Sequence, residues 1–316
     1  MSGGSLGAQC HELMKIVDLI SRENPLQRKR IGAFLARQDD SYFRFAEDLS
    51  RTLNETLLIA ERDRTEAARS YNKMCMDFLY EQIRFKKTGV YRLSDAADAA
   101  EEVYGNLAVM RYYMVGLLLS YMFWPNHYRL FRFFRENLPV SGVGRYLEVG
   151  IGHGLFTAEV LRRYPGLAAT LVDISPTSIA TAKEMLRCFH VDFSDVQVIE
   201  GDYLRADLDW GSYDFIVMGE VLEHVNDAFA FLQRTHDVLR PAGIVYLTTC
   251  ANCPAIDHVY HFHSVADIRT HIASAGLSIV KDLALPADDI PEERWEEELT
   301  TINYAAILKR AERATR

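Results

Sequence analysis

Apolar positions follow two different periods along the 316-residue chain. From about residue 10 to residue 137 they recur at the spacing of an α-helix, and glycine and proline are sparse. After the sequence LPVSGVG, residues 138–144, short apolar runs alternate with helical segments. The pattern therefore predicts an all-helical domain over residues 1–140 and an α/β domain over residues 141–316.

The second domain has the pattern of a doubly wound sheet. Its apolar runs predict seven strands, near residues 145–149, 169–173, 195–199, 213–217, 243–249, 277–282 and 302–308, and helices near 154–164, 176–190, 222–239 and 264–275. No helix separates the last two strands, so we expect an antiparallel hairpin at the sheet edge. In such a sheet the ligand crevice lies at the carboxyl ends of the first strands.

The sequence RYLEVGIGHGLFTAEVL, residues 145–161, joins the first predicted strand to a helix. Its glycines, Gly150, Gly152 and Gly154, have the spacing G-x-G-x-G, whereas the dinucleotide fingerprint is G-x-G-x-x-G. Glu148 precedes them, and we expect its carboxylate to face the crevice. A carboxylate there suits a cofactor with ammonium and sulfonium groups better than a pyrophosphate, which favours S-adenosylmethionine over NAD.

Two further acids follow the next strands. Asp173, in ATLVDIS, ends the second predicted strand, where a carboxylate can accept hydrogen bonds from both ribose hydroxyls. Asp202, in VIEGDYL, follows the third strand and can accept a hydrogen bond from the adenine amino group. Either acid alone could be a helix cap or a solvated turn residue. Together with Glu148 and the glycines, they predict one adenosyl-binding crevice.

These motifs resemble the class I S-adenosylmethionine-dependent methyltransferases over about residues 145–309. LEVGIGHG is similar to the glycine-rich motif of that family, LVDIS to its ribose-binding acid, IEGDYL to its adenine-side motif, and YDFIVMGEVLEHV and LRPAGIVYLTT to its fourth strand and the entry to its fifth. The resemblance implies a Rossmann-like seven-stranded sheet with a reversed last strand, and S-adenosylmethionine as cofactor. It adds Ile174, Tyr203 and Glu220 to the cofactor-binding residues and does not extend to residues 1–140.

Methyl transfer from a sulfonium needs an acceptor held in line with the methyl group, and a base where that acceptor is protonated. His224, in GEVLEHV, is the leading candidate for the base because an imidazole titrates near neutral pH, and Glu220 is the second catalytic candidate. The alternative is that His224 only caps or packs the start of the helix predicted at residues 222–239.

A helix beginning at residue 220 would place Glu220, Glu223 and His224 on one face, where they could hold a divalent metal. Similar ExxEH sequences are metal ligands in some ubiquinone-biosynthesis and small-RNA 2′-O-methyltransferases, and a later histidine would complete such a site. Metal-free members of the family share the sequence, with Glu223 then pointing to solvent. We therefore expect no metal.

Further polar-tipped residues are candidates to surround the acceptor. The histidines of NCPAIDHVYHFHS are expected to form a polar pocket wall, with a metal site or a proton shuttle as alternatives: His258, His261 and His263. The aromatic segment at residues 101–137 mainly fills the helical core, and some of its members are candidates to roof the acceptor pocket: Tyr112, Tyr113, Tyr121 and His127. The same helices could instead form a homodimer interface.

Composition limits the class of partner. The formal net charge of −9 argues against binding of nucleic acid or of an anionic membrane surface. The N-terminal sequence MSGGSLGAQC lacks a signal-peptide pattern, and the apolar run at residues 114–124 is shorter than the roughly 20 residues of a spanning helix, so we expect a cytoplasmic protein. The five cysteines are expected to be reduced thiols.

The sequence thus predicts a transferase that moves a methyl group from S-adenosylmethionine to an oxygen or nitrogen of a small metabolite, in natural-product or secondary metabolism. Two alternatives stay open. One is an enzyme that breaks another carbon–sulfur bond of the same cofactor and releases methylthioadenosine. The other is a non-catalytic cofactor-binding protein whose helical domain docks a partner.

Overall fold

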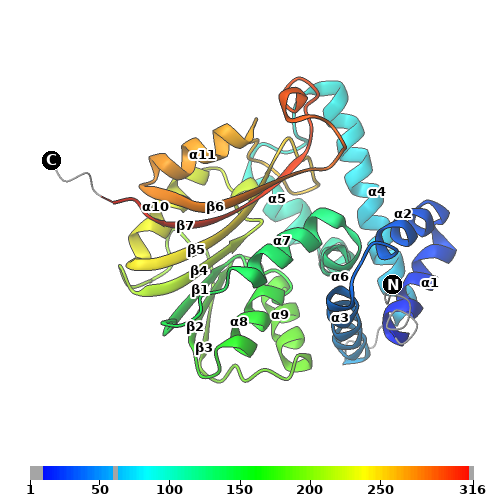
Figure 1. Cartoon of the computed structure of the whole chain (residues 1–316), viewed down its shortest axis with the longest axis horizontal. Helices are drawn as coiled ribbons and strands as arrows, with labels where there is room; N and C mark the ends of the chain where they lie inside the picture. Colours follow the sequence, from blue (N-terminus) through cyan, green and yellow to red (C-terminus); the bar gives the residue numbers. More distant parts are fainter. Residues whose placement is uncertain (1–9, 60–62, 313–316) are drawn as a thin grey trace.

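The computed structural model describes residues 10–59 and 63–312. The first half of the described chain is helical (Figure 1). Its elements are α1 (His11–Glu23), α2 (Pro25–Leu35), α3 (Asp40–Ile59), α4 (Arg64–Thr88), α5 (Ala96–Ala99), the π-helical turn η2 (Ala100–Tyr104), α6 (Leu107–Phe123) and α7 (Pro125–Glu136). Side-chain caps set several of the starts: Asp63 accepts a hydrogen bond from the Glu66 amide at α4, and Asn106 accepts from the Ala108 amide at α6.

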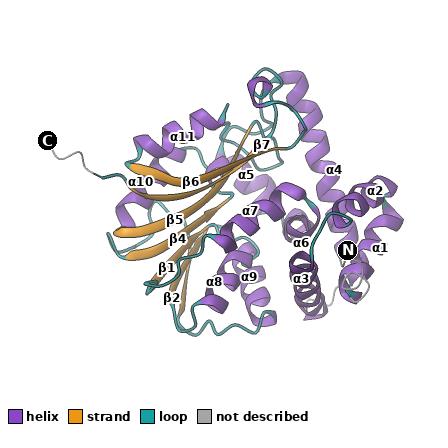
Figure 2. Ribbon diagram, in the orientation of Figure 1, coloured by secondary structure: helices purple, strands orange, loops and turns teal. Residues whose placement is uncertain are grey.

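The second half alternates strands and helices (Figure 2). Its elements are β1 (Arg145–Val149), α8 (Leu155–Arg163), β2 (Ala168–Asp173), α9 (Pro176–Cys188), β3 (Val196–Glu200), β4 (Tyr213–Gly219), η3 (Leu222–His224), α10 (Ala228–Val238), β5 (Leu239–Ala251), α11 (Val265–Ser274), β6 (Leu277–Pro286), η4 (Glu292–Arg294) and β7 (Ile302–Arg310). The strand order is β3-β2-β1-β4-β5-β7-β6, with β7 antiparallel to both of its neighbours. This confirms the predicted seven-stranded sheet with a reversed last strand.

Alternate strand residues enter two hydrophobic clusters, one on each face of the sheet. Tyr146 and Phe215 pack with residues of α6, α7, α8 and α9, whereas Leu147 and Ile216 pack with residues of α10 and α11. The helices of the first half continue the first cluster beyond the sheet, on the side where Figure 1 shows α1 to α4 and α6. One continuous core therefore joins the two halves of the chain.

The sheet places its functional edge at the switch between β1 and β4. Val149 pairs with Val172 of β2 and with Met218 of β4, so the three strands end at the same level. Because the order of the strands reverses at this point, the chain leaves β1 and β4 in opposite directions and a crevice opens between the outgoing loops. The glycine loop, residues 150–154, follows β1 at this edge. Asp173 ends β2 there, and Glu220 follows β4.

The helix predicted at residues 222–239 is broken, and that prediction is wrong. A single 3-10 turn, η3, covers Leu222–His224, and Val225 is extended. Asp227 then caps α10 by accepting a hydrogen bond from the Ala230 amide at 2.9 Å. The side chains of Asn and Asp compete with helical hydrogen bonding, which explains the restart at this position.

The apolar run at residues 114–124 lies in α6, which is mostly buried in the core. No single described helix is both long enough and apolar enough to cross a membrane; α6 and α7 pass such a test only as a pair, and they are bent by 78° at the break between them. The five cysteines, all within the described residues, form no disulfide bond with one another.

Candidate active site

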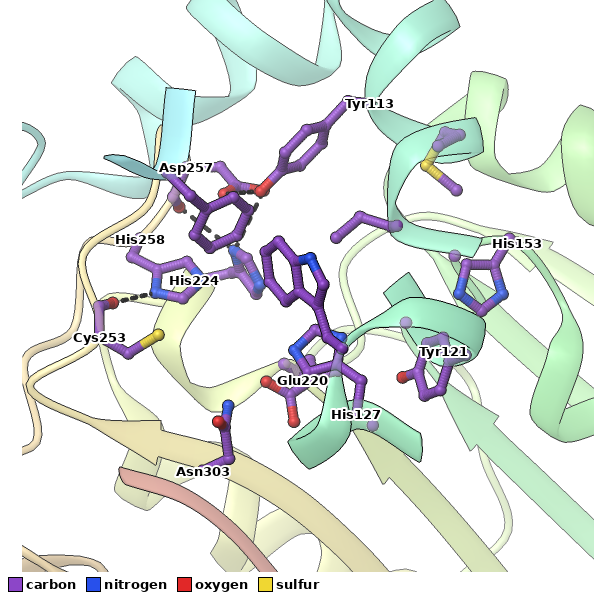
Figure 3. A pocket seen from close by; sticks show the side chains of 18 of the residues that line it. Tyr113, Tyr121, His127, His153, Glu220, His224, Cys253, Asp257, His258 and Asn303 are labelled. Carbon is purple, nitrogen blue, oxygen red and sulfur yellow. Dashed lines mark hydrogen bonds and ion pairs between the residues drawn. The ribbon is translucent and has the colours of Figure 1, made fainter. Parts of the chain in front are cut away.

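A cavity of 1620 Å³ begins at the carboxyl ends of β1, β2 and β4 and continues between the helices of the first half. At the sheet it is lined by the glycine loop, Asp173, Asp202 and Glu220. Among the helices it is lined by residues of α2, α4, α6 and α7. Figure 3 shows the middle of this cavity, where side chains of the strand ends and of the helices face one another.

Two of the three glycines line the cavity. Gly150 has φ +71° and Gly152 has φ +52°, conformations that favour glycine, and a Cβ on Gly152 would meet open space. Gly154 does not line the cavity, so its predicted contact with the cofactor is wrong in this structure. A Cβ on Gly154 would lie 3.2 Å from the Cβ of Ala182, so this glycine instead lets α8 begin close against α9.

The two acids predicted to hold the adenosyl group both line the cavity. The carboxylate of Asp173, only 9% exposed, accepts hydrogen bonds from the amides of Ser175 at 2.8 Å and Gly152 at 3.3 Å. Burial raises its pKa. The carboxylate of Asp202 accepts from the Leu204 amide at 2.9 Å. These bonds fix both carboxylates and leave lone pairs for hydroxyl or amino donors.

The neighbours Ile174 and Tyr203 also line the cavity. Ile174 exposes 59% of its surface, which leaves an apolar side chain free to cover a flat ring. Tyr203 is buried, and its hydroxyl lies 3.2 Å from that of Thr235. Both residues therefore lie beside Asp173 and Asp202 in the lining of the cavity, and their contact with a cofactor stays a prediction.

Glu148 does not line the cavity, so the expectation that its carboxylate faces the crevice is wrong. The side chain is 1% exposed and accepts hydrogen bonds from the hydroxyls of Tyr146, at 2.7 Å, and Thr157. Burial raises its pKa to about 7. Its place in the middle of β1 directs it toward α8, whereas the residues that follow the strand line the cavity.

Glu220 and Glu223 form a buried carboxylate pair beneath the cavity. Glu220 has φ +53°, a rare conformation for a residue other than glycine, and it lines the cavity. Glu223 is fully buried and accepts a hydrogen bond from Thr249 at 2.7 Å, so the expectation that it would point to solvent is wrong. Burial raises the pKa of both groups, and for Glu223 the charge of Glu220 adds to the effect.

Each of these carboxylates has a buried Oε1 atom that accepts no hydrogen bond from an N–H or O–H donor of the described residues, although the two carboxyl groups lie close enough to share a proton. A buried, unpaired carboxylate oxygen is costly, and a cation beside it would remove the cost and lower both pKa values. The pair therefore fits a positively charged group, either the cationic end of a cofactor or a metal ion.

His224 lies above this pair and lines the cavity with 19% of its side chain exposed. Its Nδ1 is 3.0 Å from the Tyr104 hydroxyl and 3.5 Å from Asp257 Oδ2 (Figure 3 shows Asp257), and its Nε2 is 3.8 Å from Glu223 Oε1. The same Asp257 accepts a hydrogen bond from Tyr113 at 2.8 Å. Asp257 thus holds one side of the imidazole and leaves the other toward the carboxylates and the cavity.

Asp257 and Tyr104 are functional candidates that the sequence pattern does not predict. Asp257 directly precedes His258 in NCPAIDHVYHFHS, so its place in this histidine-rich segment is the only sequence feature that indicates a functional role for it. Tyr104 ends the π-helical turn η2, which carries one residue more per turn than an α-helix and so shifts every later side chain around the axis. No sequence periodicity marks such a turn.

Four of the seven residues predicted to surround the acceptor line the cavity: Tyr113, Tyr121, His127 and His258. The other three do not, and those predictions are corrected here. Tyr112 donates a hydrogen bond to Asp77 of α4 at 2.6 Å. His261 pairs with Asn252 at 2.8 Å, and His263 is exposed beside it.

Three of the imidazoles that line the cavity, those of His127, His153 and His258, are neutral at pH 7. Burial lowers the pKa of His127 and of His258 to about 4, and that of His153 to about 3. His258 Nδ1 lies 2.6 Å from the carbonyl oxygen of Cys253, so Nδ1 carries the proton and Nε2 is left as an acceptor or ligand atom.

A metal ion would find ligands in this cluster. Glu223, His224 and His258 each offer one ligand atom, and these atoms lie within 4.8 Å of one another. Cys250, Cys253 and His258 form a second such group. Burial and the neighbouring Cys253 raise the pKa of the Cys250 thiol well above its usual value, which disfavours the thiolate that a metal needs. The carboxylate and imidazole group suits a divalent cation better.

Residues 147–245 match the family model described as "Methyltransferase domain". A protein of Xanthomonas campestris pv. campestris (strain B100), named ubiquinone biosynthesis O-methyltransferase, is 33% identical over 113 residues, which are 35% of this chain and 45% of that protein. A protein of the same name from Parvibaculum lavamentivorans is 28% identical over 187 residues, covering 53% of this chain and 72% of that one. The chain thus spans less than half the length of the first relative.

Among solved structures, mitomycin 7-O-methyltransferase is similar over 83% of this chain and 75% of its own, with a TM-score of 0.51 and 15% identity. Phosphoethanolamine N-methyltransferase 2 of Haemonchus contortus, solved with S-adenosylhomocysteine, has a TM-score of 0.50 and 12% identity, over 70% of this chain and 62% of that one. At these identities the likeness concerns the fold. It agrees with the seven-stranded sheet and with helices added before it.

Proposed function

Because residues 147–245 are a methyltransferase domain of the class I S-adenosylmethionine-dependent type, we propose that this protein transfers the cofactor's methyl group to a hydroxyl oxygen of a small molecule. One observation carries the proposal. The cavity that begins at the acids following β2 and β3 continues without a break into an aromatic chamber between the helices, so cofactor and acceptor can meet inside it.

S-adenosylmethionine is the cofactor of this domain, and the residues at the strand ends fit it. Asp173 would hold the ribose, Asp202 and Ile174 the adenine, and the backbone of Gly150 and Gly152 would approach closely. The unpartnered Glu220 Oε1 offers a negative charge to the cationic end. When bound, the cofactor supplies an electrophilic methyl group on a sulfonium.

His224 is the proposed base. With Nδ1 protonated and held by Tyr104 and Asp257, its Nε2 has a free lone pair that can accept the proton of an acceptor hydroxyl. The Asp257 carbonyl oxygen, 3.2 Å from Nδ1, fixes this tautomer, and the Asp257 carboxylate, 3.5 Å from Nδ1, would stabilise the imidazolium that forms. An oxygen acceptor is favoured because both sequence relatives are named O-methyltransferases.

A second version of this function uses a divalent metal, against the expectation from sequence. The observation that favours it is the pair of unpartnered Oε1 atoms on Glu220 and Glu223, beside His224 and His258. A metal there would bind the acceptor hydroxyl and lower its pKa, so that no separate base is needed.

Incubation with EDTA followed by desalting distinguishes the two versions. Loss of activity that Mg²⁺ restores supports the metal, and unchanged activity supports His224 as base.

The experiment that tests the proposal follows a methyl-labelled cofactor. The purified protein is incubated with labelled S-adenosylmethionine, with and without a small-metabolite extract, and products are followed by mass spectrometry. Label on an extract compound together with S-adenosylhomocysteine supports methyl transfer, and the mass of that compound tests natural-product metabolism as the proposed setting. Label kept in methylthioadenosine would mean that another carbon–sulfur bond breaks. Tight cofactor binding with neither product would support a non-catalytic role.

A further inference from the structure

The cavity extends well beyond the cofactor crevice. Ring contacts order its wall: His153 in the glycine loop lies 5.3 Å from Tyr121 between ring centroids, Tyr121 lies 5.5 Å from His127, and His127 lies 4.8 Å from Trp124. Beyond Trp124 the lining passes to α4 and α2. The proposed reaction uses none of the residues at that far end.

Tyr71, on α4, lies at the far end with its ring fully buried, 5.6 Å from that of Phe123. Its hydroxyl is buried and makes no hydrogen bond of good geometry among the described residues, and its polar neighbours are the Cys75 thiol and the Trp124 indole. Buried hydroxyl groups in native structures are almost always hydrogen-bonded. A ligand atom that accepts from this hydroxyl would therefore complete the site.

Arg30, on α2, lines the same end. Burial raises the pKa of the Cys75 thiol to about 11, and the charge of Arg30 acts against that rise. The same charge acts on the hydroxyl of Tyr71. Arg30 is an exposed residue that lines the same cavity as Tyr71 and Cys75, and it forms no ion pair with a described carboxylate.

Three further cations line this end without an ion-pair partner in the described parts of the chain: Lys29, Arg37 and Arg129. Arg132 also lines it but pairs with Glu136 at 3.2 Å. Partial burial lowers the pKa of Arg129, and the charge of Arg132 adds to this. In a chain of net charge −9, such an unbalanced group of cations beside an unpartnered hydroxyl points to an anionic ligand.

We propose that Arg30 and Tyr71, with Lys29, Arg37 and Arg129 around them, form an anion subsite for the methyl acceptor. The acceptor would carry a carboxylate or a phosphate monoester at the end opposite its reacting hydroxyl. The wall between the two ends includes Met114, Leu117 and Trp124, so the body of the acceptor is hydrocarbon or aromatic. This inference rests on the proposed function, because it assigns the remote end of the same acceptor.

The test measures binding without turnover, so that it is independent of methyl transfer. Protein saturated with S-adenosylhomocysteine is titrated with 8-phenyloctanoate, with its methyl ester and with 8-phenyloctyl phosphate, and binding is followed by calorimetry. We expect the carboxylate or the phosphate to bind about tenfold or more tightly than the ester, because charge-assisted hydrogen bonds are the strong ones. The stronger of the two anions identifies the natural group, and the preference should decrease with added salt.

Variants locate the subsite. Arg30→Gln should reduce the preference for the anion to less than about threefold, Arg30→Lys should keep most of it, and Tyr71→Phe should weaken only the anions. Arg28→Gln is the matched control, because Arg28 is an exposed residue of α2 that does not line the cavity. Equal affinity of ester and anions for the wild type, or equal effects of the Arg28 and Arg30 variants, would overturn the proposal. Absence of labelled product in the turnover experiment would leave these binding ratios unaffected.

Discussion

At the scale of single residues, the carboxylates near the cavity have different tasks because their neighbours differ. Asp173 is held by backbone amides, Glu220 has an oxygen without a partner, and Glu148 is enclosed by two hydroxyl donors away from the cavity. Closeness in sequence to the glycine motif therefore does not by itself make an acid a ligand for the cofactor.

Glu148→Gln tests this assignment. The folded-state pKa of Glu148 is about 7, above its ordinary value of 4.5, so the stability linked to the proton is fully present below pH 4.5 and is lost as pH rises through 7. The glutamine variant cannot lose that proton, so its stability should fall less over this window, by up to about 3 kcal/mol at pH 8. Urea unfolding from pH 4.5 to 8 measures this, and parallel profiles for the two proteins would contradict it.

His224→Gln tests the proposed base. We expect kcat to fall by about 10²- to 10⁴-fold, because the variant cannot accept the acceptor's proton, with little change in affinity for S-adenosylhomocysteine. Asp257→Asn should also lower kcat, because it removes the negative charge 3.5 Å from Nδ1 that would stabilise the imidazolium of His224. His263→Gln is the control, because that imidazole is exposed and outside the cavity. A His224 variant with the full rate would place the base elsewhere.

At the scale of elements, Gly152 and Gly154 have different roles: Gly152 lines the cavity, and Gly154 allows α8 to pack closely against α9. Gly154→Ala should destabilise the fold by about 2–3 kcal/mol, because φ is +79° and the new Cβ would press on the backbone of α9. Gly152→Ala should cost only about 1 kcal/mol but should weaken S-adenosylhomocysteine binding, because that position lines the cavity. Thermal unfolding and calorimetric titration of both variants would show whether the two effects separate in this way.

Sequence pattern predicts those elements whose apolar period is uninterrupted. The central strands qualify because helices bury both of their faces, whereas the edge strands β3 and β6 are only partly buried. The residues predicted at the strand ends, Asp173, Asp202 and Glu220, line one cavity. The break at Val225 and the π-helical turn that ends at Tyr104 were not predicted. Both depend on local competition for hydrogen bonds, which leaves the spacing of apolar residues almost unchanged. The prediction for His261 and His263 failed for a different reason. Two histidines separated by one residue in an extended segment share a face, but the sequence does not indicate whether that face borders the cavity.

At the scale of the whole molecule, contacts between residues far apart in sequence hold the helical half on the sheet. Gln82 donates a hydrogen bond to Thr301 at 2.7 Å, Arg92 to the Ile256 carbonyl at 2.6 Å, and the Tyr246 hydroxyl to the Leu130 carbonyl at 2.9 Å. These pairings lie outside what periodicity can predict, because they join segments more than 100 positions apart. The homodimer expected from sequence stays a prediction.

A shared core predicts cooperative unfolding. Calorimetry of the full chain should show one transition rather than two, because hydrophobic side chains of both halves belong to one cluster. S-adenosylhomocysteine at 100 times its Kd should add about 2.7 kcal/mol to the free energy of unfolding. Two resolved transitions, with only the later one moved by the ligand, would show that the halves unfold separately.

The division of the cavity between strand ends and helices bears on how such a protein can diverge. Residues of α2 and α4 that line only the far end, such as Arg30, can mutate toward a new acceptor while the adenosyl-binding acids are inherited unchanged. Tyr121 is less free to drift, because its ring also packs on Phe131 and Phe156 of the common core. We therefore expect substitutions that change the acceptor to accumulate first among the residues that line the far end of the cavity.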